Sequence, residues 1–118
     1  MPKTETLLPL KPLVFDVLLI LNEAECHGYG IAKELQERSP AGRRILPGNL
    51  YRTLSGMIGS DLIEKSPRRG AAKEEDERRR YFRITAFGRR VAKAEAERLQ
   101  DRVALAREQR LLSGSQAR

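Results

Sequence analysis

Apolar residues recur at helical spacing near the start of the chain. From Leu10 to Leu21 they return every three or four positions, which puts them on one face of a helix. The residues of this series are Leu10, Leu13, Val14, Val17, Leu18 and Leu21. Pro12 fits the first turn of such a helix, because its missing N–H group would have no partner there. The pattern therefore predicts an amphipathic helix over residues 11–22.

A second, shorter helix is predicted over residues 28–38. Ile31, Ala32 and Leu35 form its inward side, and the charged residues between them face solvent. Residues 39–42 are Ser, Pro, Ala and Gly, a composition that ends the helix and begins a loop.

A third helix is predicted over residues 47–60. Pro47 suits its first turn, and apolar residues follow at helical spacing. These apolar residues are Leu50, Leu54, Met57 and Ile58. Asp61 can close the helix, because Asp tolerates the left-handed backbone conformation that often ends one.

The rest of the pattern predicts two strands and a long final helix. Residues 63–67 and 80–84 contain Ile, Tyr and Phe, and the charged segment between them indicates a hairpin with a long loop. Thr85 can cap the next helix with its hydroxyl group. This order of elements is typical of a mainly α fold with a small β-hairpin, the winged helix-turn-helix, followed by a long C-terminal dimerisation helix.

This organisation predicts one folded unit with extensions. We expect an N-terminal arm at residues 1–9, a winged helix-turn-helix DNA-binding domain at residues 10–84, and a dimerisation helix at residues 85–112. Residues 113–118 are expected to form a frayed tail.

Composition narrows the function classes. The chain carries 23 Lys and Arg residues against 16 Asp and Glu, a formal net charge of +7, which favours nucleic acid as a partner. Cys26 is the only cysteine and His27 the only histidine, so we expect no disulfide, no metal and no cofactor. The apolar run ending at Leu21 is shorter than the ~20 residues of a membrane-spanning helix. We expect a cytoplasmic protein that binds no membrane.

The polar face of the third predicted helix is the main candidate site. Away from the apolar stripe it presents Gly48, Asn49, Arg52, Ser55, Gly56 and Gly59. A helix enters the major groove of DNA only where its outer side chains are short, and Asn and Arg pair with adenine and guanine edges. Asn49 and Arg52 are therefore predicted to read bases. The alternative is an ordinary exposed face on a helix weakened by glycine.

Other residues are candidates for contacts with the DNA backbone. Arg43 and Arg44 precede the third helix, Gly48 lies in its first turn, and Tyr51 stands beside Arg52. Tyr29, at the start of the second helix, could hold a phosphate together with backbone amides. Tyr51 could equally be a half-buried packing residue, and a catalytic pairing of Cys26 with His27 is disfavoured.

The charged loop between the predicted strands has basic arms and an acidic tip. The arms contain Arg68, Arg69, Lys73, Arg78, Arg79 and Arg80, and residues 74–77 are all Glu or Asp. The basic arms suit a DNA backbone or minor groove. The tip must face away from phosphate or pair with the arginines, and a simply solvated loop remains an open alternative.

One face of the final helix carries a narrow apolar stripe. Its members are Ala92, Ala96, Leu99, Val103 and Ala106, close to heptad spacing and flanked by charges. Such a stripe favours a partner helix from a second copy. A homodimer would present two third helices about 34 Å apart, the spacing of a pseudo-palindromic site.

Several motifs, taken in order, resemble the PadR family of bacterial transcriptional regulators over residues 10–112. They are His27-Gly28-Tyr29-Gly30-Ile31, Leu46-Pro47-Gly48-Asn49-Leu50-Tyr51-Arg52-Thr53-Leu54, Leu62-Ile63-Glu64 and Arg79-Arg80-Tyr81-Phe82-Arg83-Ile84-Thr85, with Gly88 in the next turn. The single C-terminal helix is similar to that of the compact subfamily. The resemblance implies winged-helix homodimers that repress transcription and release DNA when a small-molecule effector binds.

The resemblance also implies roles for single residues, and the chain departs from it in places. It places Tyr29 and Tyr51 near DNA phosphates and the basic wing residues near the minor groove. Asn49 stands where the family more often has Ser or Thr, and Ser60-Asp61 replaces the usual acidic residue and Gly. The chain has no Trp, so the binding of aromatic drugs between tryptophans is not carried over.

Three function classes remain to be compared. The first is a sequence-specific repressor that uses the third helix and the wing. The second is a non-specific nucleic-acid or protein-interaction module, in which that helix is only scaffold. An enzyme is disfavoured, since no paired carboxylates, nucleophile with a base, or phosphate-binding glycine loop stands out.

Overall fold

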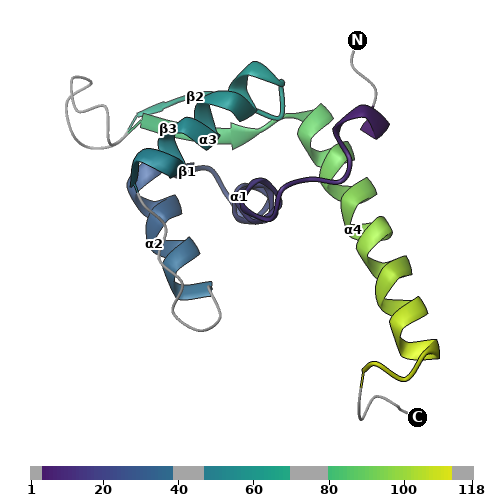
Figure 1. Ribbon diagram of the computed structural model, residues 1–118. Helices are drawn as coiled ribbons and strands as arrows, with labels where there is room; N and C mark the ends of the chain where they lie inside the picture. The colour runs from purple at the N-terminus through teal and green to yellow at the C-terminus, as the bar shows by residue number, and fades with distance from the viewer. Residues whose placement is uncertain (1–3, 39–46, 70–79, 113–118) are drawn as a thin grey trace.

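The computed structural model describes residues 4–38, 47–69 and 80–112 of the 118-residue chain. Within these ranges a mostly helical chain carries one small antiparallel sheet (Figure 1). The elements are η1 (Thr4–Leu7), α1 (Pro12–Glu23), β1 (Cys26–His27), α2 (Gly28–Arg38), α3 (Pro47–Gly59), β2 (Ile63–Arg69), β3 (Arg80–Ile84) and α4 (Ala86–Glu108). This order is that of the predicted winged helix-turn-helix with a long C-terminal helix.

The observed bounds differ from the predicted ones by small amounts. α2 and β3 begin and end where the pattern predicted, and α1 and α3 differ by one residue at their ends. β2 continues two residues further than predicted, to Arg69, and α4 ends at Glu108 instead of reaching residue 112. α4 ends early because Arg110 adopts a left-handed φ of 64° and the Leu111 N–H donates to the Ala106 carbonyl at 2.9 Å, which closes the helix.

The prediction of a two-stranded hairpin lacked one strand, because β1 also joins the sheet. β1 pairs antiparallel with β3, with Cys26 opposite Phe82 and His27 opposite Tyr81, and the strand order is β1-β3-β2. A strand of two residues is too short to show alternation of apolar and polar positions. Its existence depends on β3 being close enough to pair with it.

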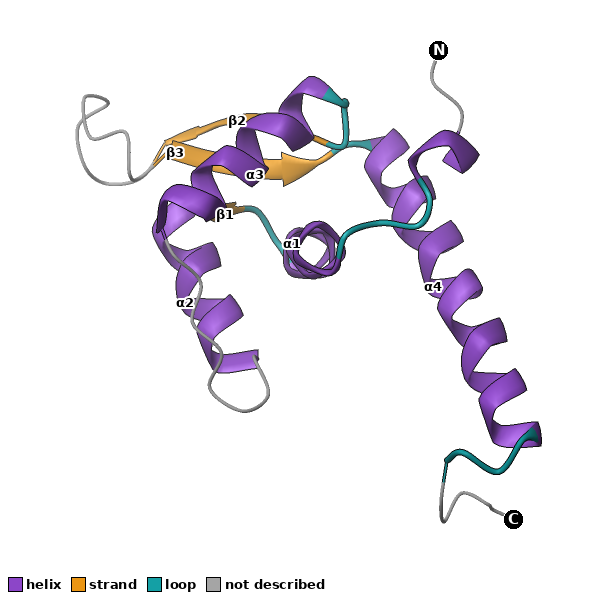
Figure 2. Ribbon diagram, in the orientation of Figure 1, coloured by secondary structure: helices purple, strands orange, loops and turns teal. Residues whose placement is uncertain are grey.

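The core lies where the four α-helices meet the sheet. α1 crosses the middle of the molecule, between α2 and α4, with α3 and the sheet against it (Figure 2). The four α-helices and β2 contribute fully buried residues, among them Leu18, Ile31, Leu50, Ile63 and Val91. The helical periodicity of the sequence therefore sets which face of each helix points into this core.

A tight C-terminal cap turns the chain from α3 into β2. Asp61 has a φ of 64°, its N–H donates to the Ile58 carbonyl at 3.0 Å, and the Leu62 N–H donates to the Met57 carbonyl at 2.9 Å. These two bonds and the left-handed residue make a Schellman motif. The prediction that Asp61 closes the helix is confirmed.

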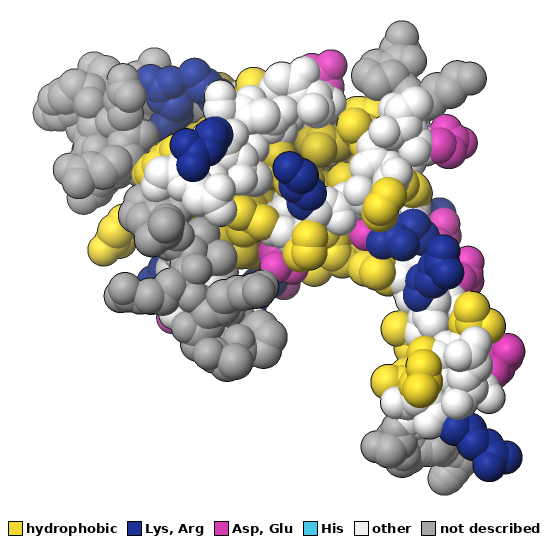
Figure 3. Space-filling view, in the orientation of Figure 1, with side chains coloured by type: hydrophobic (Ala, Val, Ile, Leu, Met, Phe, Trp, Pro, Cys, Tyr) yellow, Lys and Arg dark blue, Asp and Glu magenta, His cyan; other side chains and the backbone are white. Residues whose placement is uncertain are grey.

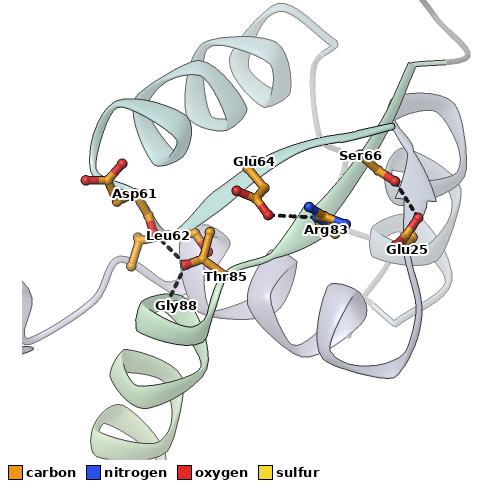
Figure 4. Close-up of polar contacts among 8 residues, drawn as sticks. All are labelled: Glu25, Asp61, Leu62, Glu64, Ser66, Arg83, Thr85 and Gly88. Atoms are coloured by element: carbon orange, nitrogen blue, oxygen red, sulfur yellow. Dashed lines mark hydrogen bonds and ion pairs between the residues drawn. The ribbon is translucent and has the colours of Figure 1, made fainter. Parts of the chain in front are cut away.

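The same junction anchors α4. The Thr85 hydroxyl accepts from the Gly88 N–H at 2.8 Å, as predicted for a cap, and donates to the Asp61 carbonyl at 2.6 Å (Figure 4). Gly88 lies against the Leu62 carbonyl so closely that an added Cβ would overlap that oxygen. Glycine is therefore required at position 88, where the first turn of α4 packs directly against the backbone just before β2.

The wing strands are irregular toward their outer ends. Ile63 to Lys65 pair in register with β3, and the register then shifts before Arg69 pairs with Arg80. Pro67 lies in this irregular stretch, where the absent N–H of proline removes no ladder hydrogen bond. Near the regular part, Arg83 donates to Glu64 at 2.7 Å and Ser66 to Glu25 at 2.6 Å (Figure 4).

The segment before α1 is docked on α4. η1 contacts α4, and Leu7, Leu8 and Leu10 pack against the core cluster. The Leu10 N–H also donates a hydrogen bond to the carboxylate of Glu95 in α4. The described part of the predicted arm is thus held to the final helix by both apolar and polar contacts.

Candidate nucleic-acid interface

The predicted reading face of α3 is exposed. Leu50, Leu54 and Met57 are at most 2% exposed and hold the helix to the core, and the 3.6-residue period turns the opposite side outward. On that side Gly48, Asn49, Arg52, Ser55, Gly56 and Gly59 are all exposed.

Three glycines on this face have no packing role within the described residues. A Cβ added at Gly48, Gly56 or Gly59 would meet no atom within 4 Å. Each glycine inside a helix costs about 1 kcal/mol relative to alanine. These glycines therefore lower the stability of α3, and no contact with the described residues explains why glycine stands at these positions.

A hollow lies along one flank of α3, between this helix and the segment that leads into α1; we call it the arm-side hollow. It has a volume of about 470 Å³, and its lining includes Leu10, Lys11, Val14, Asn49 and Arg52. None of the described residues that line it carries a carboxyl group. Both predicted base-reading residues therefore border one basic hollow.

A second hollow lies on the opposite flank, between α3 and the wing strands; we call it the wing-side hollow. It measures about 580 Å³, and its lining includes Tyr51, Ser55, Lys65 and Arg80 over Leu54 and Phe82. Again, no carboxyl group occurs among the described lining residues. Figure 3 shows separate basic side chains set among hydrophobic and uncharged atoms across this part of the surface.

Tyr51 is placed by its contact with the start of α2. A Cβ added to Gly28 would lie 3.1 Å from both the Cε1 and the hydroxyl oxygen of Tyr51, so the ring covers this glycine. Tyr51 is 41% exposed and Tyr29, the next residue of α2, is 71% exposed. The two interpretations of Tyr51 are thus compatible, because the ring packs on α2 while part of the side chain reaches solvent.

Cys26 and His27 serve the fold at this point. The Gly30 N–H donates to His27 Nδ1 at 2.9 Å, and the imidazole meets the Tyr81 ring edge-on with centroids 5.3 Å apart. Burial, reinforced by Glu34, raises the pKa of the Cys26 thiol. A protonated thiol beside an imidazole that already accepts a hydrogen bond gives no activated nucleophile.

Several predicted contacts lie outside the described residues. These are Arg43, Arg44, Lys73, Arg78 and Arg79, together with the acidic residues 74–77. Arg68 and Arg69 end β2, and Arg80 begins β3 with an exposed side chain.

The predicted dimer stripe on α4 divides between the core and solvent. Ala92 packs against the core cluster, whereas Ala96 is exposed, Leu99 is 36% exposed and Val103 is 42% exposed. Ala106 is half-buried near the end of the helix, where the Leu111 N–H donates to its carbonyl at 2.9 Å. The stripe thus begins inside the domain and continues on an unpacked surface.

Glu95, the buried charged residue of the described core, was not predicted from the sequence. It is 2% exposed, and Arg98 donates to both of its carboxylate oxygens, at 2.8 and 2.9 Å. These bonds, with that from the Leu10 N–H, lower the pKa of the Glu95 carboxyl although burial opposes the shift. The spacing of Glu95 and Arg98, three residues apart on a helix, was the available signal.

The described residues offer neither a metal site nor a membrane span. Within residues 4–38, 47–69 and 80–112, no group of three or more His, Cys, Asp or Glu residues could hold a metal ion. None of the helices described there is both long and apolar enough to cross a bilayer.

Comparison with known proteins gives a consistent picture. The model of the transcriptional regulator PadR-like family matches residues 17–94. A PadR family transcription regulator from Clostridium difficile has a TM-score of 0.70 at 22% identity, covering 83% of this chain and 97% of that one. A search of curated proteins found no match.

Two further solved structures show the same fold. A transcriptional regulator from Clostridium thermocellum has a TM-score of 0.66 at 23% identity, over 81% of this chain and 87% of that one. RosR from H. salinarum has a TM-score of 0.63 at 23% identity, over 90% of this chain and 99% of that one.

Proposed function

Because the chain belongs to the PadR-like family and is thus a DNA-binding transcriptional regulator and no enzyme, we propose that it is a cytoplasmic, homodimeric repressor. It binds a pseudo-palindromic operator and is released from it by a small-molecule effector. The winged helix-turn-helix at residues 10–84 supplies the DNA contacts, and the segment at residues 85–112, which contains α4, supplies the dimer.

The observation that carries this proposal is the outer face of α3. It combines exposed Asn49 and Arg52 with glycines whose absent side chains leave open space. A backbone that can come close to the floor of a major groove allows short polar side chains to reach base edges. Asn49 and Arg52 read bases in this proposal.

Contacts with the DNA backbone set the register of α3. Tyr51 and Tyr29 lie at the junction of α3 with the start of α2, and Gly48 lies in the first turn of α3. Hydroxyl groups and exposed amides at helix N-termini are ordinary phosphate ligands. In the same proposal, further basic residues attract the phosphates of the DNA backbone. They are Arg43 and Arg44 before α3 and the wing residues Arg68, Arg69, Lys73, Arg78, Arg79 and Arg80.

The dimer follows from the exposed part of the stripe on α4. Ala96, Leu99 and Val103 leave apolar surface that this chain does not cover within its described residues, and a second α4 would cover it in coiled-coil fashion. Two copies would present their α3 helices to half-sites about 34 Å apart. An effector that changes this separation would release the DNA.

Selection of bound duplexes from a random pool by the purified protein tests the reading role. We expect a pseudo-palindromic sequence to be enriched, and Arg52→Ala to lose about 1–3 kcal/mol of discrimination at one base pair. Arg102→Ala, which removes an exposed cation from α4, is the matched control. Equal binding of all duplexes would contradict the proposal, and an unchanged preference in Asn49→Ala would favour the non-specific module.

Gly56→Ala separates folding from DNA binding on the same face. The free energy of unfolding should rise by up to about 1 kcal/mol, because alanine is the better helix former and its Cβ meets nothing. Operator affinity, measured by fluorescence anisotropy, should fall at least threefold because the added methyl group keeps α3 out of the groove. Gln36→Ala, at an exposed site on α2, is the control; an equal operator affinity for both variants would argue against close approach.

A further inference from the structure

The two hollows make the surroundings of α3 nearly symmetric in charge. The wing-side hollow has Lys65 and Arg80 in its lining, and the arm-side hollow has Lys11 and Arg52. Neither has a carboxyl group among its described lining residues. A helix in a major groove about 12 Å wide has a phosphate backbone along each flank. A basic hollow on each side of α3 matches this arrangement.

We propose that the arm-side hollow receives the phosphodiester backbone of the second strand bordering the groove, with Lys11 as its phosphate contact and Glu95 as a positioning residue. This inference rests on the proposed function of α3 as the helix that reads DNA. Lys11 and Asn49 line the same hollow, so a strand held by Lys11 lies next to the bases that Asn49 is proposed to read.

The backbone at Lys11 is fixed from both sides. On one side the Leu10 N–H donates to Glu95; on the other, the Lys11 carbonyl accepts from the Phe15 N–H at 3.0 Å and begins α1. The Lys11 side chain itself is exposed. A cation on a fixed backbone loses less conformational entropy when it binds phosphate than one on a loose tail.

Glu95 connects this contact to the final helix. Glu95 is 2% exposed, and its carboxylate accepts two hydrogen bonds from Arg98, so it offers the Leu10 N–H a fixed acceptor. Arg98 lies between Ala96 and Leu99, the first two members of the exposed part of the apolar stripe. The position of Lys11 therefore depends on the helix on which the dimer is proposed to form.

The first measurement is the salt dependence of operator affinity for Lys11→Gln. We expect the affinity at about 0.1 M salt to fall roughly fivefold, and the slope of log K against log salt to become shallower by about 1. Lys93→Gln, which neutralises an exposed lysine on α4, should leave both quantities unchanged. An unchanged slope in Lys11→Gln overturns the inference. Wild-type protein that prefers no duplex would instead contradict the proposed function.

The second measurement tests the positioning role of Glu95. Glu95→Gln should speed hydrogen exchange at the Leu10 amide and weaken operator binding, and adding Lys11→Gln to it should weaken binding little further. Fully additive effects overturn the positioning role. Arg98→Met removes the same support from Glu95 and replaces Glu95→Gln if that variant does not fold.

A small anion is the competing occupant of the arm-side hollow. Decanoate has an apolar chain and one carboxylate, so it serves as the probe. Two results together would overturn the inference and assign the hollow to a small-molecule ligand. Decanoate would displace operator DNA from the wild-type protein but not from Lys11→Gln, and the salt slope of Lys11→Gln would be unchanged. No effect of decanoate on the wild-type complex supports the DNA strand as the occupant.

Discussion

The two halves of α4 have similar apolar spacing but opposite surroundings. In the first half Val91 is fully buried and Glu95 is 2% exposed, whereas in the second half Leu99 is 36% and Val103 is 42% exposed. Figure 1 shows the second half extending away from the rest of the molecule. The first half of the helix therefore completes the core of its own domain, whereas the second half leaves apolar surface that the described residues do not cover.

The largest expected effect is in the anchored half. Gly88→Ala places a methyl group on the Leu62 carbonyl and within 3.0 Å of the Ile84 side chain, and backbone cannot yield as a side chain would. We expect a loss of about 3 kcal/mol in the free energy of unfolding, measured by urea titration. Gly59→Ala is the control, because its added Cβ meets no atom within 4 Å. Equal stability of the two variants would mean that the close contact of Gly88 with the Leu62 carbonyl does not anchor the first half of α4.

A smaller effect is expected where the halves meet, and it depends on pH. The pKa of Glu95 is lower in the folded chain than its usual value, so its contribution to stability is present above the unfolded pKa of about 4.3 and is lost as pH falls through the folded pKa. Glu95→Gln should cost about 1.5 kcal/mol at pH 7, as charged hydrogen bonds do.

That cost should shrink at pH values below the folded pKa, where the wild-type carboxyl is also neutral. Urea titrations of both proteins across the acid range measure it. Glu97→Gln, at an exposed site on the same helix, should show no such dependence. If the free energies of unfolding of wild type and Glu95→Gln differed by the same amount at all pH values, the charge of Glu95 would not be the source of its contribution to stability.

The smallest effect on the fold is expected in the second half. Leu99→Glu with Val103→Glu should change the stability of the separated protomer by no more than about 0.5 kcal/mol, because both side chains are exposed. The mass in solution, measured by light scattering, should fall from dimer to monomer, and operator affinity should fall with it. Leu105→Glu is the control, since Leu105 is exposed but lies off the predicted stripe. A dimer that survives the double change would place the interface elsewhere.

Much of the local structure was predictable from the sequence. Helical spacing predicted the four α-helices within a few residues at their ends, and single residues predicted two boundaries: Thr85 as a cap and Asp61 as a left-handed end. The reason is that these features depend on interactions within one or two turns of the chain. The exposed face of α3, with Asn49 and Arg52, followed from the same spacing.

Only the tertiary structure decided the features that join distant segments. β1 is a strand because β3 lies beside it, and Glu95 is buried because the segment before α1 folds over α4. The division of α4 into a packed and an exposed half, and the two basic hollows beside α3, also arise from long-range packing. Burial and pairing between segments far apart in the chain depend on where each one ends up, and the residues near a position carry no local record of that.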